Sequence, residues 1–177
     1  ELSKFNKPIF YDGKFFDIKN TLVNSIKSLK DLKVSYATVH LLNGLDALSE
    51  ANDVANNINI KLLGVSVLTS FGNEELDQLG FKDQVEEQVL RLTKIANEAN
   101  LFGVICSPLE IKIIKKVAPS LKCFTPGIRQ DKNKNDQKRT MNAKQAMEAG
   151  SDCLIIGRPI TEGDPKKNIQ EILSSLN

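Results

Sequence analysis

The sequence has no tryptophan, one histidine and only two methionines among its 177 residues, and it lacks any long apolar run. Its most hydrophobic stretches, KLLGVSVLTS and DCLIIG, are far shorter than the ~20 residues that a membrane-spanning helix needs. No basic segment followed by an apolar one stands at its start, as a secretory signal would require. We therefore expect a cytoplasmic protein with no membrane partner.

Cysteine is also scarce. Cys106, Cys123 and Cys153 are odd in number and lie in strand-like runs, without the close pairing that is typical of a zinc site. A disulfide framework is not expected from this pattern. We expect three reduced, partly buried thiols and no metal site.

Positive charge is concentrated in one loop. The net charge is +2, and residues 128–139, IRQDKNKNDQKR, hold five cations and two acids, a net of +3, so the other 165 residues sum to −1. Most charged runs of this kind are solvated surface. A nucleic-acid partner would require broader basic patches and more aromatic residues. The distribution favours a small anionic ligand and no nucleic acid.

Apolar, β-branched runs alternate with amphipathic stretches along the whole chain. Strands are expected near residues 8–11, 34–41, 60–68, 102–106, 121–125 and 153–156. Helices are expected over residues 20–32, 44–57, 82–100, 108–118, 142–150 and 165–176. Apolar strands separated by helices predict a parallel sheet that is covered on both faces.

Six strand–helix units in 177 residues amount to about 30 residues each, the repeat of a TIM (β/α)8 barrel of ~250 residues. We expect an α/β fold of that class, with six of the eight units in this chain. No linker-like stretch divides it, which predicts one domain over residues 1–177, incomplete at its N-terminus. The first residue is Glu1 and the methionines are Met141 and Met147, so we expect a fragment or a processed product. An open doubly wound sheet is the alternative architecture.

The most chemically suggestive stretch is YDGKFFDIKNT, residues 11–21. Asp12 and Lys14 are two apart on a strand, so their side chains project from the same face, and Asp17 follows in the next loop. The carboxylate favours the ammonium form of Lys14, which is then able to protonate a developing carbanion. Asp12 would also repel a substrate carboxylate, and loss of CO₂ would relieve that repulsion. The alternative is a structural salt bridge at a strand end.

Two later strands are each followed by glycine and arginine. Gly127 precedes Arg129 in CFTPGIRQ, and Gly157 precedes Arg158 in LIIGRPIT. Glycine lets backbone N–H groups approach an anion, and arginine presents a bidentate fork to phosphate. Each pair alone is also typical of a turn with a solvated side chain. Their recurrence after consecutive strands favours a phosphate site, as in the last two loops of many barrels.

Several stretches together resemble the orotidine 5′-phosphate decarboxylase family. They follow the order and spacing of that family over almost the full length: DGKFFDIKNT, LLGVSVLTS, GVICSP, TPGIR, DQKR and AGSDCLIIGRPIT. The resemblance implies decarboxylation of orotidine monophosphate (OMP) to uridine monophosphate (UMP), without metal or cofactor, by a homodimer with shared active sites. The charges of residues 12–17 would then be the catalytic array.

The same resemblance implies roles for individual residues. Lys14 would protonate C6, Asp12 would lie beside the departing carboxylate, and Asp17 and Thr21 would reach the ribose pocket of a partner subunit. Thr69 would contact the pyrimidine. The phosphate would be held by four residues: Gln137, Arg129, Gly157 and Arg158.

The chain departs from the family at several points. Phe16 and Lys19 stand where the family usually has His and Pro, and Gly13 replaces a common Leu. We expect these changes to tune the loop and the dimer interface. The family also has an Asp after its first strand and a Lys after its second, and neither strand is in this sequence. We therefore expect residues 1–177 alone to be inactive.

Other interpretations stay open. A related Mg²⁺-dependent sugar-phosphate decarboxylase or aldolase uses a similar strand, and a non-catalytic phosphate-binding remnant would keep the arginines. His40, the sole histidine, is expected to pack or to form hydrogen bonds and not to act as a base. Residues 130–138 are polar and charged, which predicts a mobile lid over a bound anion.

Overall fold

The computed structural model describes residues 2–129 and 139–176. Its six strands lie in the sheet in the order β1-β2-β3-β4-β5-β6, the same order as in the sequence. The strands are β1 Phe10–Phe15, β2 Tyr36–His40, β3 Lys61–Val65, β4 Gly103–Ile105, β5 Lys122–Thr125 and β6 Cys153–Leu154. The β1–β2, β2–β3 and β5–β6 pairs are parallel. This sequential order does not match the doubly wound alternative, in which the strand order reverses at a switch point.

Helices follow every strand. The α-helices are α1 Lys19–Ser28, α2 Leu45–Asn57, α3 Asn73–Gln78, α4 Val85–Glu98, α5 Ile111–Val117, α6 Ala143–Glu148, α7 Arg158–Thr161 and α8 Pro165–Ser175. Short 3₁₀ turns are η1 Leu2–Phe5, η2 Leu29–Leu32, η3 Leu41–Asn43 and η4 Pro108–Glu110. The predicted helices are found, whereas α3 and α7 were missed because they are too short to show a periodic pattern. Within the described ranges, no helix has both the length and the apolar character needed to cross a bilayer.

The chain divides into two compact units. The first comprises Glu1–Ser66 and Arg91–Val104, and the second comprises Val67–Leu90 and Ile105–Asn177. The residues predicted to do the chemistry, between Asp12 and Thr21, belong to the first unit. The residues predicted to hold the pyrimidine and the phosphate belong to the second.

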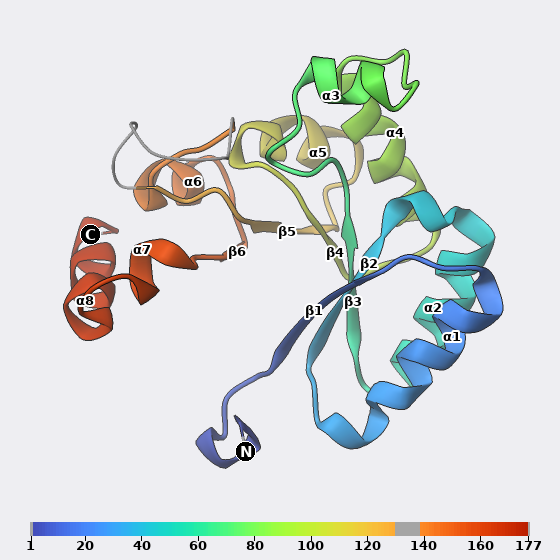
Figure 1. Ribbon diagram of the computed structural model, residues 1–177, viewed down its shortest axis with the longest axis horizontal. Helices are drawn as coiled ribbons and strands as arrows, with labels where there is room; N and C mark the ends of the chain where they lie inside the picture. Colours follow the sequence, from blue (N-terminus) through green and yellow to red (C-terminus); the bar gives the residue numbers. More distant parts are fainter. Residues whose placement is uncertain (1, 130–138, 177) are drawn as a thin grey trace. The chain divides into compact units, whose positions relative to one another are not determined.

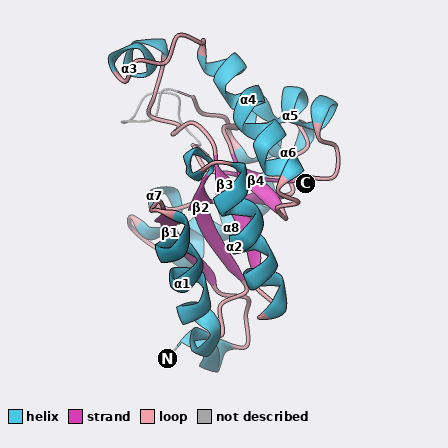
Figure 2. Cartoon of the chain, turned by 90° about the vertical axis from the view of Figure 1, so that its right-hand side faces the viewer, coloured by secondary structure: helices cyan, strands magenta, loops and turns pink. Residues whose placement is uncertain are grey.

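In the first unit, α1 and α2 run side by side along the strands β1 to β3 (Figures 1 and 2). Leu22 and Ile26 of α1 are fully buried, as is Leu48 of α2, because they recur at helical spacing on one face. The central strands supply the facing layer through buried Val39 and Leu62. Burial of such side chains contributes about 1.5–3 kcal/mol each.

Strand β1 differs from the prediction. It was expected to end at residue 11 as a buried run, but it continues to Phe15 and its four central residues are exposed. β1 comes first in the sheet order and pairs with β2. Asp12 and Lys14 therefore lie within the strand and not after it, at the outer position of the sheet.

Lys19, one of the departures from the family pattern, links the two helices of the first unit. Its ammonium lies 3.1 Å from a carboxylate oxygen of Asp46 and 3.1 Å from one of Glu50, both on α2. Hydrogen bonds to Glu50 and Asp46 raise the pKa of Lys19. All three side chains are well exposed, so the network orients the start of α1 more than it stabilises the fold.

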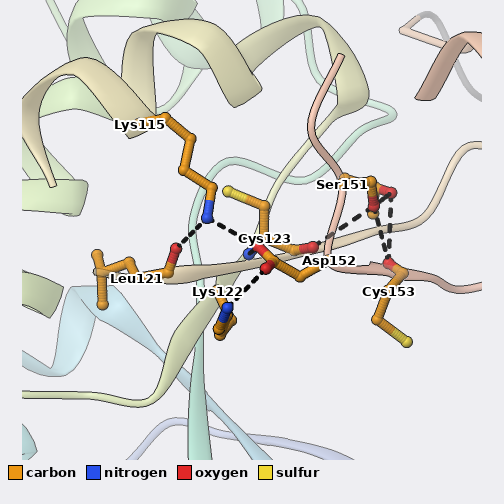
Figure 3. A network of polar contacts seen from close by, with 8 residues as sticks. Lys115, Leu121, Lys122, Cys123, Ser151, Asp152 and Cys153 are labelled. Carbon is orange, nitrogen blue, oxygen red and sulfur yellow. Dashed lines mark hydrogen bonds and ion pairs between the residues drawn. The ribbon is translucent and has the colours of Figure 1, made fainter. Parts of the chain in front are cut away.

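The second unit has its own apolar cluster, built from Ile128, Ala143 and Ala146 with Ile172 of α8. A polar network joins the starts of β5 and β6 (Figure 3). Asp152 is its centre. Its Oδ2 accepts hydrogen bonds from Lys115 Nζ at 2.8 Å and from the N–H of Cys123 at 2.9 Å, and its Oδ1 accepts one from Lys122 Nζ at 2.9 Å.

Partial burial alone would raise the pKa of the Asp152 carboxyl, but these three donors outweigh it and lower the pKa from 3.8 to about 2. The carboxylate form is thus preferred in the folded state. A depressed carboxyl pKa adds stability that is present above the unfolded value and disappears as the pH falls through the folded value. The window here runs from pH 3.8 down to about 2.

Replacing Asp152 by asparagine is expected to lower the free energy of unfolding by about 1–2 kcal/mol at pH 7. The difference between the variant and the wild type should shrink as the pH falls from about 4 to about 2, because both side chains are then uncharged. Urea unfolding of both proteins at pH 7, 4 and 3 measures this difference in the free energy of unfolding. Asp31→Asn, at an exposed aspartate, is the control. A difference that does not change with pH would contradict the assignment.

Candidate functional site

Asp12 and Lys14 form an ion pair on the exposed side of β1. Lys14 Nζ lies 2.5 Å from Asp12 Oδ2, and the two side chains are 45% and 46% exposed. The expectation that residues two apart on this strand share a face is confirmed. Nearly half of each side chain is therefore open to solvent.

Thr38 of β2 forms hydrogen bonds with both residues of this pair. Its side chain is fully buried, and its hydroxyl donates to Asp12 Oδ1 at 2.9 Å while accepting the backbone N–H of Lys14 at 2.8 Å. Both carboxylate oxygens of Asp12 are therefore engaged, one by Thr38 and one by Lys14. The sequence suggested no role for Thr38, since a threonine inside a strand is also a common packing residue.

Lys14 has an unusual backbone. Its φ is +44°, in the left-handed region, and the pairing of β1 with β2 shifts register between Tyr11 and Phe15. A non-glycine residue in this region costs of order 1 kcal/mol and persists only where its surroundings impose it. Such strain is concentrated at functional sites, where a bulge redirects a side chain. The hydrogen bond to Thr38 is one interaction that holds Lys14 in this conformation.

Asn43 connects the loops that follow β1 and β2. Its side-chain amide donates to the carbonyls of Phe15 at 2.9 Å and His40 at 2.7 Å, and its Oδ1 accepts the N–H of Asp17 at 3.1 Å. Asp17 turns its own Oδ1 to the N–H of Ile18 at 2.7 Å. Sequence reasoning missed Asn43, although its place just before a glycine is typical of a turn residue.

His40, at the end of β2, is half-buried and its ring is 5.7 Å from that of Phe16. Burial, and then the positive charge of Lys14, lower its pKa. The imidazole is therefore neutral at neutral pH, as suits a packing or hydrogen-bonding role. The ring that contacts His40 belongs to Phe16, one of the departures expected from the sequence resemblance.

The opening of α1 is exposed. Thr21 lies in its first turn and is exposed, while Phe16 and Ile18, on either side of Asp17, are 62% and 75% exposed. Single exposed apolar side chains are ordinary, but here two of them flank a residue that was predicted to serve a partner subunit.

The second unit carries the predicted phosphate-binding residues. Gly127, just after β5, has φ +80°, a conformation that favours glycine. The N–H of Arg129 donates to the carbonyl of Met141 at 2.9 Å, and its guanidinium Nη1 donates to the carbonyl of Ile128 at 2.8 Å. Its Nε is buried and has no hydrogen-bond partner among the described residues.

The loop after β6 places Gly157 directly before Arg158, the first residue of α7, and both are exposed. A side chain added at Gly157 would meet no described atom within 4 Å, so this position is open. Thr69 is in the turn after β3 and is half-buried. Gln137 and the lid predicted over residues 130–138 lie outside the described residues.

No group of three or more His, Cys, Asp or Glu side chains is placed to hold a metal ion in the parts of the chain that the structure describes. Cys106, Cys123 and Cys153 are free thiols, the first two buried and the third partly so. The expected burial of the three side chains is confirmed, and their reduced state stays a prediction.

The family model for orotidine 5′-phosphate decarboxylase / HUMPS matches residues 1–172. The chain belongs to that family. A curated orotidine 5′-phosphate decarboxylase from Wolbachia pipientis subsp. Culex pipiens is 42% identical over 99% of this chain and 79% of its own length. One from Ehrlichia chaffeensis is 39% identical over 96% of this chain and 75% of its own length.

A solved structure of the family has the same fold. The crystal structure of orotidine 5′-phosphate decarboxylase from Lactobacillus acidophilus superposes with a TM-score of 0.85 and 34% identity, over 99% of this chain and 78% of that chain. The resemblance found in the sequence motifs is therefore confirmed. The roles of individual residues in this chain stay predictions.

Proposed function

We propose that this chain catalyses decarboxylation of OMP to UMP, with Lys14 as the proton donor. The observation that carries the proposal is the 2.5 Å ion pair between Lys14 and Asp12, held by the buried hydroxyl of Thr38, in a chain of this family. The bond from C6 to the carboxylate carbon breaks, CO₂ leaves, and the electron pair stays on C6. Lys14 then transfers a proton from Nζ to C6 and recovers one from solvent.

Asp12 contributes to the same step. Its carboxylate cannot turn away from the substrate, because Thr38 binds one oxygen and Lys14 the other. A substrate carboxylate bound beside it would be repelled, and the repulsion would end when CO₂ departs. Lys14, fixed by the same carboxylate, would stabilise the carbanion as its charge develops.

The second unit would supply binding energy. Thr69 would contact the pyrimidine, and Arg129, Gly157 and Arg158 would hold the phosphate with Gln137. The positive φ of Gly127 and the open position at Gly157 support close approach of backbone N–H groups to an anion. The buried Nε of Arg129 is a further donor.

The direct test is OMP turnover by the purified full-length protein, followed by the loss of substrate absorbance, with and without EDTA, beside a sample of residues 1–177 alone. We expect the full-length protein to turn over OMP with and without EDTA, since the proposed mechanism uses no metal, and residues 1–177 alone to be inactive. Dependence on added Mg²⁺ would favour a sugar-phosphate decarboxylase or aldolase activity. UMP binding without turnover would favour a phosphate-binding protein.

Replacing Thr38 by valine is expected to lower kcat by about 10- to 100-fold, because Asp12 and Lys14 lose the hydroxyl that positions them. The affinity for UMP should change little, since Thr38 is buried beneath the pair. Steady-state kinetics and UMP titration measure the two effects. Thr38→Ser keeps the hydroxyl and should retain most activity; a valine variant with unchanged kcat would remove Thr38 from this role.

We also propose that the active unit is a homodimer in which Asp17 and Thr21 complete the ribose pocket of the partner. The exposed side chains of Phe16 and Ile18 around Asp17 support a contact with a second copy. Mixing inactive Lys14→Ala and Asp17→Ala chains should restore about a quarter of the wild-type activity, because half of the dimers are mixed and each then has one intact site. No recovery after mixing would argue that both residues act in the same subunit.

The barrel assignment is part of the same proposal. The six strands would be six of the eight units of a (β/α)8 barrel, which fits a chain that covers 79% and 78% of the lengths of two relatives. An experimental structure of the full-length protein would test it: eight parallel strands closed into one sheet would support the proposal, and an open sheet would contradict it.

The cytoplasm is the proposed compartment, because all three thiols are free. Cell fractionation would test that location.

A further inference from the structure

A buried ion pair in the second unit lies outside the residues assigned so far. Arg139 Nη1 contacts Glu110 Oε1, and the two side chains are only 12% and 6% exposed. Burial lowers the pKa of the Arg139 guanidinium. An ion pair that is removed from water in this way adds little net stability and is costly to break, so its main effect is better sought in the groups that it positions.

The pair connects three of the loops that follow strands. Arg139 Nη2 donates to the carbonyls of Val67 at 3.1 Å and Leu68 at 2.8 Å, after β3. Glu110 Oε2 accepts the N–H of Ser107 at 3.0 Å, after β4, and the hydroxyl of Ser107 donates to the carbonyl of Arg139 at 3.3 Å.

The third loop, which follows β5, is connected to Arg139 by backbone hydrogen bonds. Two residues after Arg139, Met141 accepts the N–H of Arg129 at 2.9 Å and donates its own N–H to the carbonyl of Gly127 at 3.3 Å. The segment that begins at Arg139 is therefore paired with the loop after β5. Fixing Arg139 fixes the backbone that presents Arg129.

The loop after β3 depends on the same guanidinium. The carbonyl of Leu68 accepts both Arg139 Nη2 and, at 2.9 Å, the N–H of Phe71. Leu68 thus opens a tight turn, and Thr69 lies inside it. Without Arg139, the carbonyls of Val67 and Leu68 would lose a charged donor.

We infer that Arg139 and Glu110 are positioning residues, which hold the pyrimidine-contacting turn at Thr69 and the phosphate-contacting loop at Arg129 in register with each other. The inference rests on the proposed function for the roles of Thr69 and Arg129. It assigns no contact with substrate to Arg139 or Glu110.

The first experiment replaces Arg139 by lysine, which keeps the charge opposite Glu110 but lacks the second arm of the fork. Two results are expected. The KM for OMP should rise at least about 10-fold with a smaller fall in kcat, because the loops that contact the pyrimidine and the phosphate are held less well. Hydrogen exchange at the N–H of Phe71 should become faster. Unchanged exchange at Phe71, or an unchanged KM, would overturn the inference.

A second experiment separates positioning from stability. Glu110→Gln leaves a buried unpaired guanidinium and should lower the melting temperature, and the added change Arg139→Met should restore much of that loss. A cavity of about 340 Å³, lined by Asn73, Gln84 and Ile113, borders the pair and gives the altered side chains room to adjust. We expect the double variant to recover its melting temperature but not its KM. Recovery of both together would show a merely structural pair.

Asp152→Asn is the matched control. It also removes a partly buried, ion-paired carboxylate from the second unit, but at the starts of β5 and β6 and not in the loops that follow the strands. It should lower stability without changing KM. The wild type is assayed in parallel. Absence of OMP turnover in the wild type would overturn the proposed function, whereas normal exchange at Phe71 in Arg139→Lys would overturn the positioning inference.

Discussion

Replacement of Lys14 by alanine is expected to lower OMP turnover by at least about 10⁴-fold while UMP affinity changes only a few-fold. A positioned general acid contributes about 10²–10⁴, and electrostatic stabilisation of the developing charge adds about 10²–10³. Lys14 Nζ is held at 2.5 Å from Asp12 and would act on C6, not on the phosphate. Binding energy from the phosphate is therefore retained in the variant.

The left-handed backbone of Lys14 requires a second variant. Alanine is disfavoured at φ +44°, so part of any loss in Lys14→Ala could come from a shifted strand. Lys14→Asn also removes the ammonium, and asparagine tolerates this conformation better. Both variants should be equally inactive, with melting temperatures that differ only slightly. A parallel loss of UMP binding in both, or turnover within about 10-fold of the wild type, would remove Lys14 from the role of proton donor.

Replacement of Arg158 by alanine is expected to lower kcat/KM for OMP by about 10²- to 10³-fold. Two charge-assisted hydrogen bonds from one guanidinium to a phosphate contribute about 3–5 kcal/mol together. KM should rise and kcat should also fall, because binding energy from the phosphate helps to organise the reacting centre. Arg158 is exposed after β6, and the melting temperature of the variant, measured in parallel, separates loss of binding from loss of stability.

Two comparisons make this prediction specific to phosphate. Arg158→Lys keeps the charge but loses the planar fork, and it should fall between the wild type and the alanine variant. Orotidine, which has no phosphate, should be processed equally slowly by the wild type and by Arg158→Ala. A variant that loses activity on orotidine as well would place the effect of Arg158 at the reacting centre.

The order of the elements and the central charged pair follow from local features of the sequence. Helical spacing around Leu22 and Ile26 predicts α1, and the absence of alternation in the central runs predicts buried parallel strands. The sequence places Asp12 and Lys14 two apart on a strand, which predicts that they share a face, although the left-handed backbone of Lys14 and its hydrogen bond to Thr38 were not predictable from that spacing. The Gly127 turn is equally local, since a positive φ favours glycine.

The residues that position the predicted site residues are determined only by the tertiary structure. Thr38 is 24 and 26 residues from the groups that it binds, and Arg139 is 71 residues from Leu68. No periodicity or spacing in the sequence encodes such pairs, because they form only where parallel strands bring distant loops to the same edge. The exposure of β1 was mispredicted for a related reason. β1 comes first in the sheet order and pairs with β2, and its four central residues are exposed, which its own apolar residues did not indicate.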